Sequence, residues 1–244
     1  MPDQFSSILP YILLATGAGI LGSVIALFWN PKAKMRSAIQ HFAAGAVLAA
    51  VASNVIPEVE RMGTLTGVIS GFVVGGLIMI GLKWVVVRLE REEKRGQGLP
   101  VGLAAAAAVD TLLDGVIIGA GFSVDQQLGT LLVIALGLEL FFLTLSVGVE
   151  LREAKFETWK SLAITAGIAF MLLLGAFGSS FFLADASKAT LAVVLAFGAA
   201  ALIYLIAEEL LVETIQAEES LFPTIMLFTG FLVLMALKLI GQGS

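Results

Sequence analysis

The sequence has no cysteine, a single histidine and few charged side chains. Without cysteine, the chain can form no disulfide, no thiolate metal site and no iron–sulfur cluster. Charged residues make up 14% of the 244 residues, whereas soluble domains have about 25%. The hydrophobic share of 59% is more than one soluble core can hide, and the net charge of -5 offers no basic surface for nucleic acid. A soluble enzyme and a nucleic-acid reader are therefore disfavoured.

Eight long apolar runs, joined by short connections, occupy nearly the whole chain. They cover residues 8–29, 39–58, 64–88, 100–122, 128–150, 159–183, 189–214 and 221–241. Each run reaches the ~20 residues that a transmembrane helix needs. Because lipid offers the backbone no hydrogen-bond partner, each run is predicted to be a helix. We expect an all-α polytopic membrane protein with inverted repeats, formed by one transmembrane domain over residues 1–244.

The positive charges predict the orientation in the membrane. Lysine and arginine gather in the loops after the first, third and fifth runs, at Lys32, Lys34, Arg36, Arg88, Arg91, Lys94, Arg95, Arg152, Lys155 and Lys160. We expect these loops in the cytoplasm and both termini outside it, in the cell (inner) membrane. The first run lacks a positive flank and exceeds the ~7–15 apolar residues of a signal core, so we expect no cleavable signal.

Five carboxylates lie well inside the apolar runs, where insertion of each charge costs up to about 2.5–3.5 kcal/mol. They are Asp110, Asp114, Glu139, Glu208 and Glu209. Asp110 and Asp114 are four residues apart and therefore share one helix face. The depths of their runs place Asp110 and Glu139 near the midplane. Lys83, the basic residue deepest inside a run, is expected to snorkel to the cytoplasmic interface and to leave the midplane acids without a cationic partner.

Oxygen ligands without imidazole favour hard divalent cations such as Mn²⁺ or Mg²⁺. We expect one site at the midplane, a receiving pair on the inner side at residues 208–209, and a polar group that admits the ion on the outer side at residue 54. The residues expected to contact the ion are Asp110, Thr111, Asp114, Glu139, Glu208, Glu209 and Asn54. Two alternatives remain open: the acids bond neighbouring helices, or they carry protons without a metal.

An internal similarity links the second and seventh runs. Residues 42–58 align without gaps with residues 197–213, with Phe, Ala and Glu coinciding and Ser53-Asn54 opposite Glu208-Glu209. A second alignment sets residues 110–119 on 139–148. The paired runs cross the membrane in opposite directions, and inverted repeats with polar groups at their junction are typical of transporters.

Other motifs have structural interpretations. Gly67, Gly71 and Gly75 recur every fourth residue and predict a smooth face for close helix packing. Residues 17–22 match GxGxxG, but without a preceding strand we interpret them as packing glycines and not as a dinucleotide site. His41 begins the second run, and we expect it to be an interfacial polar group in preference to a ligand.

Three segments resemble the ZIP (Zrt-, Irt-like) family of divalent metal transporters. His41-Phe-Ala-Ala-Gly-Ala-Val-Leu-Ala with Asn54-Val-Ile-Pro-Glu58 is similar to the second helix of that family. Asp110-Thr-Leu-Leu-Asp-Gly-Val-Ile-Ile-Gly119 stands where the fourth helix usually reads His-Asn-x-Pro-Glu-Gly, and residues 200–210 resemble the seventh helix. The resemblance implies transport toward the cytoplasm by an elevator motion of helices one, four, five and six against the other four.

The chain departs from the family pattern at the metal ligands. By position, Asp110 replaces the histidine of the fourth helix, Thr111 the asparagine and Asp114 the glutamate. In the fifth helix, Glu139 takes the histidine position, while Phe142 and Leu143 take the proline and glutamate positions. In the seventh helix, an acid at residue 208 stands for a histidine. These differences favour one carboxylate site over a two-metal centre.

The sequence thus predicts a ZIP-type transporter of a divalent cation of the Mn, Zn, Fe, Mg or Cd class. We expect no prosthetic group and no nucleic acid, with the ion and the lipid bilayer as partners; a homodimer is left open. An intramembrane sensor or scaffold that binds an ion or proton without moving it is the alternative. We do not expect an enzyme, because the lone His41 lies far in depth from the buried acids and forms no nucleophile–base pair.

Overall fold

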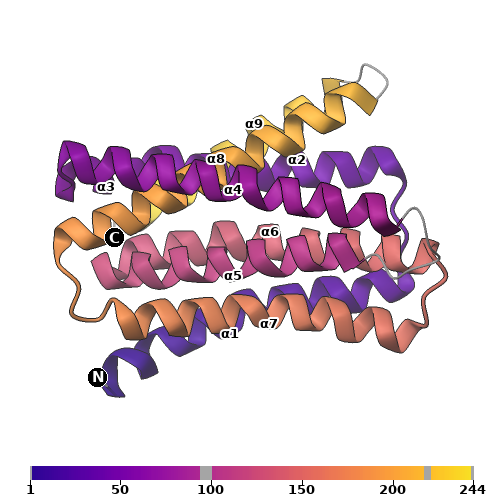
Figure 1. Ribbon diagram of the computed structural model, residues 1–244, viewed down its shortest axis with the longest axis horizontal. Helices are drawn as coiled ribbons and strands as arrows, with labels where there is room; N and C mark the ends of the chain where they lie inside the picture. The colour runs from indigo at the N-terminus through magenta and orange to yellow at the C-terminus, as the bar shows by residue number, and fades with distance from the viewer. Residues whose placement is uncertain (1, 94–100, 217–220, 243–244) are drawn as a thin grey trace.

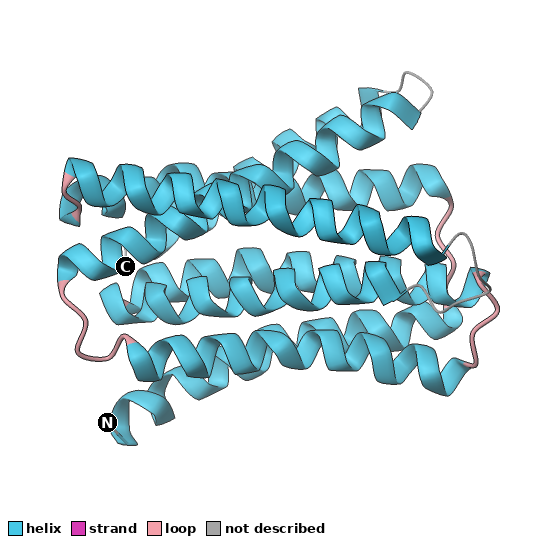
Figure 2. Ribbon diagram, in the orientation of Figure 1, coloured by secondary structure: helices cyan, strands magenta, loops and turns pink. Residues whose placement is uncertain are grey.

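The computed structural model describes residues 2–93, 101–216 and 221–242, which form long helices with short connections and no strand (Figures 1 and 2). The helical segments are α1 (Pro2–Phe28), α2 (Ala33–Ala50), η1 (Val51–Val55), α3 (Ile56–Met62), α4 (Leu65–Glu93), α5 (Val101–Val124), α6 (Gln126–Glu153), α7 (Thr158–Phe182), α8 (Lys188–Gln216) and α9 (Leu221–Gln242). Eight stretches are long and apolar enough to cross a membrane, which identifies an integral membrane protein. The predicted all-α polytopic fold is confirmed, and the predicted runs match the helices to within a few residues; the second run spans α2, η1 and α3.

The helices run between two ends of an elongated bundle (Figure 1). The basic end, as we name it, carries the loops around Lys32 and Lys155, and the opposite end carries Gly63, Asp125 and the α7–α8 connection. Helix α1 begins and α9 ends at the opposite end (Figure 1). The first helix therefore starts, and the last helix ends, at the end of the bundle away from the basic loops, as the charge distribution predicts.

The helices form two bundles with extensive internal packing. In the first bundle α5 packs along α7 and α1 along α6, whereas in the second α2 packs along α9 and α4 along α8 (Figure 1). Helices α2, α4 and α8 then contact α5 and α6 across the boundary. The first bundle holds the first, fourth, fifth and sixth spans, which is the group that the family resemblance implies as one unit.

The glycine stripe of α4 packs on α8, as predicted. A Cβ at Gly71 would lie 2.5 Å from the carbonyl oxygen of Val193, and one at Gly75 would lie 2.5 Å from that of Phe197. A Cβ at Gly67 would meet the Val193 side chain at 3.2 Å, a looser contact. Residues larger than glycine at positions 71 and 75 would therefore push the two helix backbones apart.

The internal repeat extends beyond the two aligned runs. Gly75 of α4 approaches the carbonyl of Phe197, and Gly230 of α9 approaches the carbonyl of Phe42. Both members of the first contact lie 155 positions from their counterparts in the second. The same shift brings α1 onto α7 and the continuous stretch α2–α3 onto α8 within a residue or two. The packing pairs α2·α9 and α8·α4 thus exchange under the repeat, as do α1·α6 and α7·α5.

The second span is interrupted by a π-helical turn, which the sequence analysis did not predict. Proline has no N–H, so Pro57 cannot donate to the carbonyl of Ser53 four residues earlier, as a regular α-helix requires. The backbone widens at Val51–Val55, where the N–H of Ile56 bonds the carbonyl of Val51 five residues back. The Lys238 ammonium of α9 donates to the Ser53 carbonyl instead. One lysine thereby satisfies a backbone acceptor that lipid would leave unpaired.

Replacing Lys238 with methionine should lower the free energy of unfolding by about 1–3 kcal/mol, because the Ser53 carbonyl loses its donor. In a Pro57→Ala background, the alanine N–H becomes available to that carbonyl, and the same substitution should cost much less. Unfolding of the purified protein in detergent measures both values, with Lys188→Met at an exposed position as the control. An equal loss of unfolding free energy in both backgrounds would show that Lys238 does not stabilise the fold by donating to the Ser53 carbonyl.

Candidate cation site

Three acidic side chains meet in the interior of the bundle. Asp110 and Asp114 of α5 and Glu139 of α6 each offer one carboxylate oxygen, and these oxygens lie within 4.8 Å of one another. Asp114 is 2% exposed and Glu139 is 8% exposed, while Asp110 is half-buried. The sequence prediction that these three residues lie together is confirmed. We refer to them as the carboxylate cluster.

Small residues hold the two helices that carry the cluster. A Cβ at Gly115, next to Asp114, would overlap the Leu172 carbonyl of α7, and one at Gly175 would overlap the Leu112 carbonyl of α5. On the other side, the Thr144 hydroxyl of α6 donates to the Gly19 carbonyl of α1 at 2.7 Å. The acids are therefore mounted on helices that are packed backbone to backbone, which limits how far they can move apart.

A small cavity of about 40 Å³ lies against the cluster. Its wall includes Asp110 and Glu139 from the first bundle and Gln40 and Leu205 from the second. The volume exceeds the ~10–15 Å³ that one water requires, so an ion with a water or two fits. The Gln40 amide supplies a neutral oxygen of the kind that hard cations bind. Gln40 was not predicted as a site residue, because it lies at the polar edge of its run beside His41.

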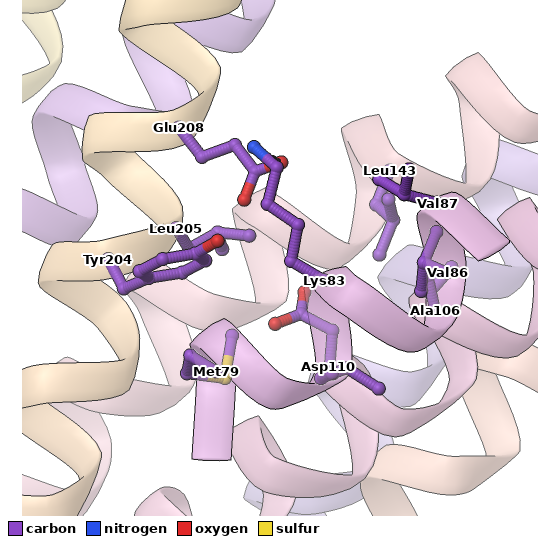
Figure 3. A pocket seen from close by; sticks show the side chains of 12 residues that line it. Met79, Lys83, Val86, Val87, Ala106, Asp110, Leu143, Tyr204, Leu205 and Glu208 are labelled. Carbon is purple, nitrogen blue, oxygen red and sulfur yellow. Dashed lines mark ion pairs between the residues drawn. The ribbon is translucent and has the colours of Figure 1, made fainter. Parts of the chain in front are cut away.

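A larger cavity of about 380 Å³ continues from Asp110 toward the basic end. It shares Asp110, Leu143 and Leu205 with the small cavity and is lined on its other side by α4 and α8. Figure 3 shows the Asp110 carboxylate on one wall, with Tyr204 and Glu208 of α8 facing it. The carboxylate cluster therefore has a wide approach from one end of the bundle.

Glu208 has a cationic partner that the sequence analysis did not predict. The Lys83 ammonium lies 2.7 Å from a Glu208 carboxylate oxygen (Figure 3). The long flexible stem of Lys83 bends along the cavity and pairs with an acid of the neighbouring helix. Glu208 is thus outside the carboxylate cluster and lies on the approach to it. Glu209 lies in α8, but its side chain is outside the described residues.

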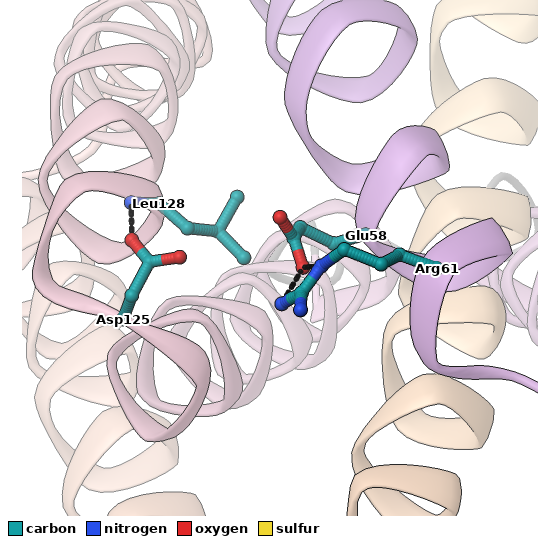
Figure 4. A network of polar contacts seen from close by, with 4 residues as sticks. All are labelled: Glu58, Arg61, Asp125 and Leu128. Carbon is teal, nitrogen blue, oxygen red and sulfur yellow. Dashed lines mark hydrogen bonds and ion pairs between the residues drawn. The ribbon is translucent and has the colours of Figure 1, made fainter. Parts of the chain in front are cut away.

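A separate polar pocket of about 120 Å³ lies at the opposite end. Asn54 is 7% exposed and lines this pocket, and its amide donates to the Ser53 hydroxyl at 3.2 Å. Figure 4 shows Glu58 of the same wall paired with Arg61 at 2.6 Å, and Asp125 capping α6 by accepting from the Leu128 N–H at 2.8 Å. Asn54 therefore lies at the depth that the sequence predicts, away from the carboxylate cluster.

Apolar side chains separate the two ends. Along α6, the pocket residue Leu131 and the cluster residue Glu139 are eight positions apart, or ~12 Å of helix. Between them, Leu132 and Leu136 are fully buried, and so is Ile118 on α5. The pocket shares no lining residue with either of the two cavities beside the cluster. The described conformation is open toward the basic end and closed toward the opposite end.

Two further candidates are placed by the structure. The Thr111 hydroxyl is completely buried and has no hydrogen-bond partner among the described residues, so it retains an oxygen for a ligand. Its role as a ligand stays a prediction. His41 is half-buried on α2, and its Nδ1 lies 2.9 Å from the Ser37 carbonyl of the same helix. The two cavities beside the cluster do not include His41 among their lining residues.

The chain's lack of cysteine makes the one-sided access directly testable. Ala106→Cys lines the larger cavity, and Leu136→Cys lies in the apolar barrier. A water-soluble thiol reagent should modify the first at least about tenfold faster than the second, because only the cavity admits water. Mass spectrometry of the purified protein gives both rates, and melting curves verify that each variant is folded. Equal rates would show that the barrier is not closed.

Comparison with known proteins assigns no family. No protein-family model matches the chain, and no curated protein matches its sequence. The resemblance to the ZIP family therefore depends on the three segments quoted above, and the function is inferred below from the carboxylates and the cavities.

Proposed function

We propose that this protein is a divalent metal cation transporter of the ZIP type, which moves its ion toward the cytoplasm through the carboxylate cluster. The observation that carries the proposal is the meeting of Asp110, Asp114 and Glu139 within 4.8 Å inside a bundle of membrane-spanning helices. Eight apolar helices with buried acids fit a membrane transporter or a binding protein; the cavities on the two sides favour transport.

The spacing of the three oxygens suits one divalent cation. Oxygen ligands lie ~2.0–2.6 Å from Mg²⁺ or Ca²⁺, so a single ion can contact oxygens up to roughly twice that far apart. Two or three negative charges confined in this space repel one another strongly, since the interior screens them poorly. A divalent ion relieves that repulsion and replaces water with carboxylate oxygens. Mn²⁺ and Mg²⁺ match this all-oxygen set best, with Zn²⁺, Fe²⁺ and Cd²⁺ as further candidates.

The position of the cluster supports an elevator-type movement. The three acids lie on α5 and α6 of the first bundle, and the walls that face them come from α2, α4 and α8 of the second. A shift of the first bundle along the second would carry the acids away from the larger cavity and toward the opposite pocket. The inverted repeat supplies two related arrangements for such a shift.

The proposed route has polar groups at both ends. Asn54 would help to admit the ion at the opposite end, and Glu208 would receive it in the larger cavity before release at the basic end. With the basic loops in the cytoplasm, the described conformation corresponds to the state that is open inward. Both termini then lie outside the cytoplasm, as the charge distribution predicts.

A non-transporting sensor or scaffold is the second candidate. The apolar barrier around Leu132 and Leu136 closes the cluster toward one end, which a protein that only binds an ion would also show. Binding of the ion to purified protein without flux through reconstituted vesicles would favour this candidate.

Asp110→Asn and Asp114→Asn should each weaken Mn²⁺ binding at least about tenfold and abolish uptake, because one negative ligand is lost from the cluster. Isothermal titration of purified protein measures the binding, and proteoliposomes loaded with a Mn²⁺-quenched dye measure the flux. Asp185→Asn, at an exposed loop position, is the matched control and should behave like the wild type. Normal uptake by Asp114→Asn in a folded protein would refute the site.

A further inference from the structure

The larger cavity contains a positive charge of the protein itself. The Lys83 ammonium bonds Glu208 at 2.7 Å, and Lys83, Glu208 and Asp110 line the same cavity. In Figure 3 the side chain of Lys83 crosses the space between the Asp110 carboxylate and Glu208. An ion that moves through this cavity between the carboxylate cluster and the basic end therefore passes close to this ion pair.

The repeat gives a second, independent observation on this lysine. Lys83 of α4 and Lys238 of α9 are 155 positions apart, and so are their acceptors, Ser53 and Glu208. One lysine reaches from α9 to η1 beside the pocket at the opposite end, and the other reaches from α4 to α8 in the cavity at the basic end. An ammonium group is therefore placed at the equivalent position of both mouths.

We infer that Lys83 is a tethered cation at the inner mouth, holding Glu208 while the path is empty and competing with the transported ion for it. This inference rests on the proposed function. An arriving divalent ion binds Glu208 only when the ammonium has moved away. Conversely, an ammonium released from Glu208 can turn toward Asp110, the other acid that lines this cavity. Lys83 thus lowers the affinity of the path for its ion and favours release.

The charge that each substitution removes predicts the direction of the change in Mn²⁺ affinity. Removing the ammonium takes away the competing ion pair of Glu208 and a repulsive charge in the cavity, so Lys83→Met should tighten Mn²⁺ binding by about tenfold. Removing the acid leaves the ammonium free to face Asp110, so Glu208→Gln should weaken binding by a similar factor. The double variant removes one charge of each sign, and its affinity should return to within about twofold of the wild type.

The experiment is isothermal titration of the full-length protein with Mn²⁺ for these three variants. The matched control is Arg88→Met, which removes a positive charge from α4 only five residues away; Arg88 stacks on Trp84, 5.4 Å from its ring centre, and is absent from the cavity wall. It should bind within about twofold of the wild type. Melting in metal-free buffer with a chelator verifies that each variant is folded.

The outcomes separate this inference from the proposed function. If Asp114→Asn loses binding while Lys83→Met binds like the wild type or more weakly, the site stands and the role of Lys83 is overturned. If Arg88→Met tightens binding as much as Lys83→Met, a general charge effect explains the result and the inference also fails. If wild type and Asp114→Asn bind Mn²⁺ equally or not at all, the proposed function fails, and the inference fails with it.

Discussion

The confinement of three acidic side chains to one small space is the constraint on which the rest of the structure depends. One carboxylate oxygen each from Asp110, Asp114 and Glu139 lies within 4.8 Å of the others, so helices α5 and α6 must be held close together. The backbone contacts at Gly115 and Gly175 and the Thr144 hydrogen bond to α1 do this. Small residues thus hold the helices that bring the three acids together.

The three acids lie at the boundary between the two bundles. A cluster completely enclosed within one bundle would have no path for an ion, whereas one at the lipid face would pay the full cost of a charge in hydrocarbon. The boundary between α5 and α6 on one side and α2, α4 and α8 on the other avoids both problems. Its walls are mostly apolar, and a few polar side chains, Gln40 and Tyr204 among them, face the cavities.

The fold and the cluster could be predicted from the sequence because both depend on local patterns. Helical runs follow from hydropathy, and the shared face of Asp110 and Asp114 follows from a spacing of four residues. The pairing with Glu139 required only the depth of two neighbouring spans. The long-range partners could not be predicted in this way. Lys83 can reach either the interface or a neighbouring helix, and its depth alone does not decide between them.

The π-helical turn shows the same limit. The sequence shows that Pro57 has no N–H to donate. The donor that replaces it is Lys238, which lies 185 positions from Ser53. The aligned runs of the repeat also did not reach α4 and α9. Only the contacts of Gly75 and Gly230 with the two phenylalanine carbonyls show that the repeat includes those helices.

The repeat is equal in geometry and unequal in chemistry. The ammonium of α4 meets a carboxylate at residue 208, whereas the ammonium of α9 meets a neutral backbone carbonyl at residue 53. Two mouths with the same helix arrangement but different partners for their ammonium groups do not open with the same free energy. In the proposed transporter, the resting populations of the two orientations would therefore be unequal even without any gradient across the membrane.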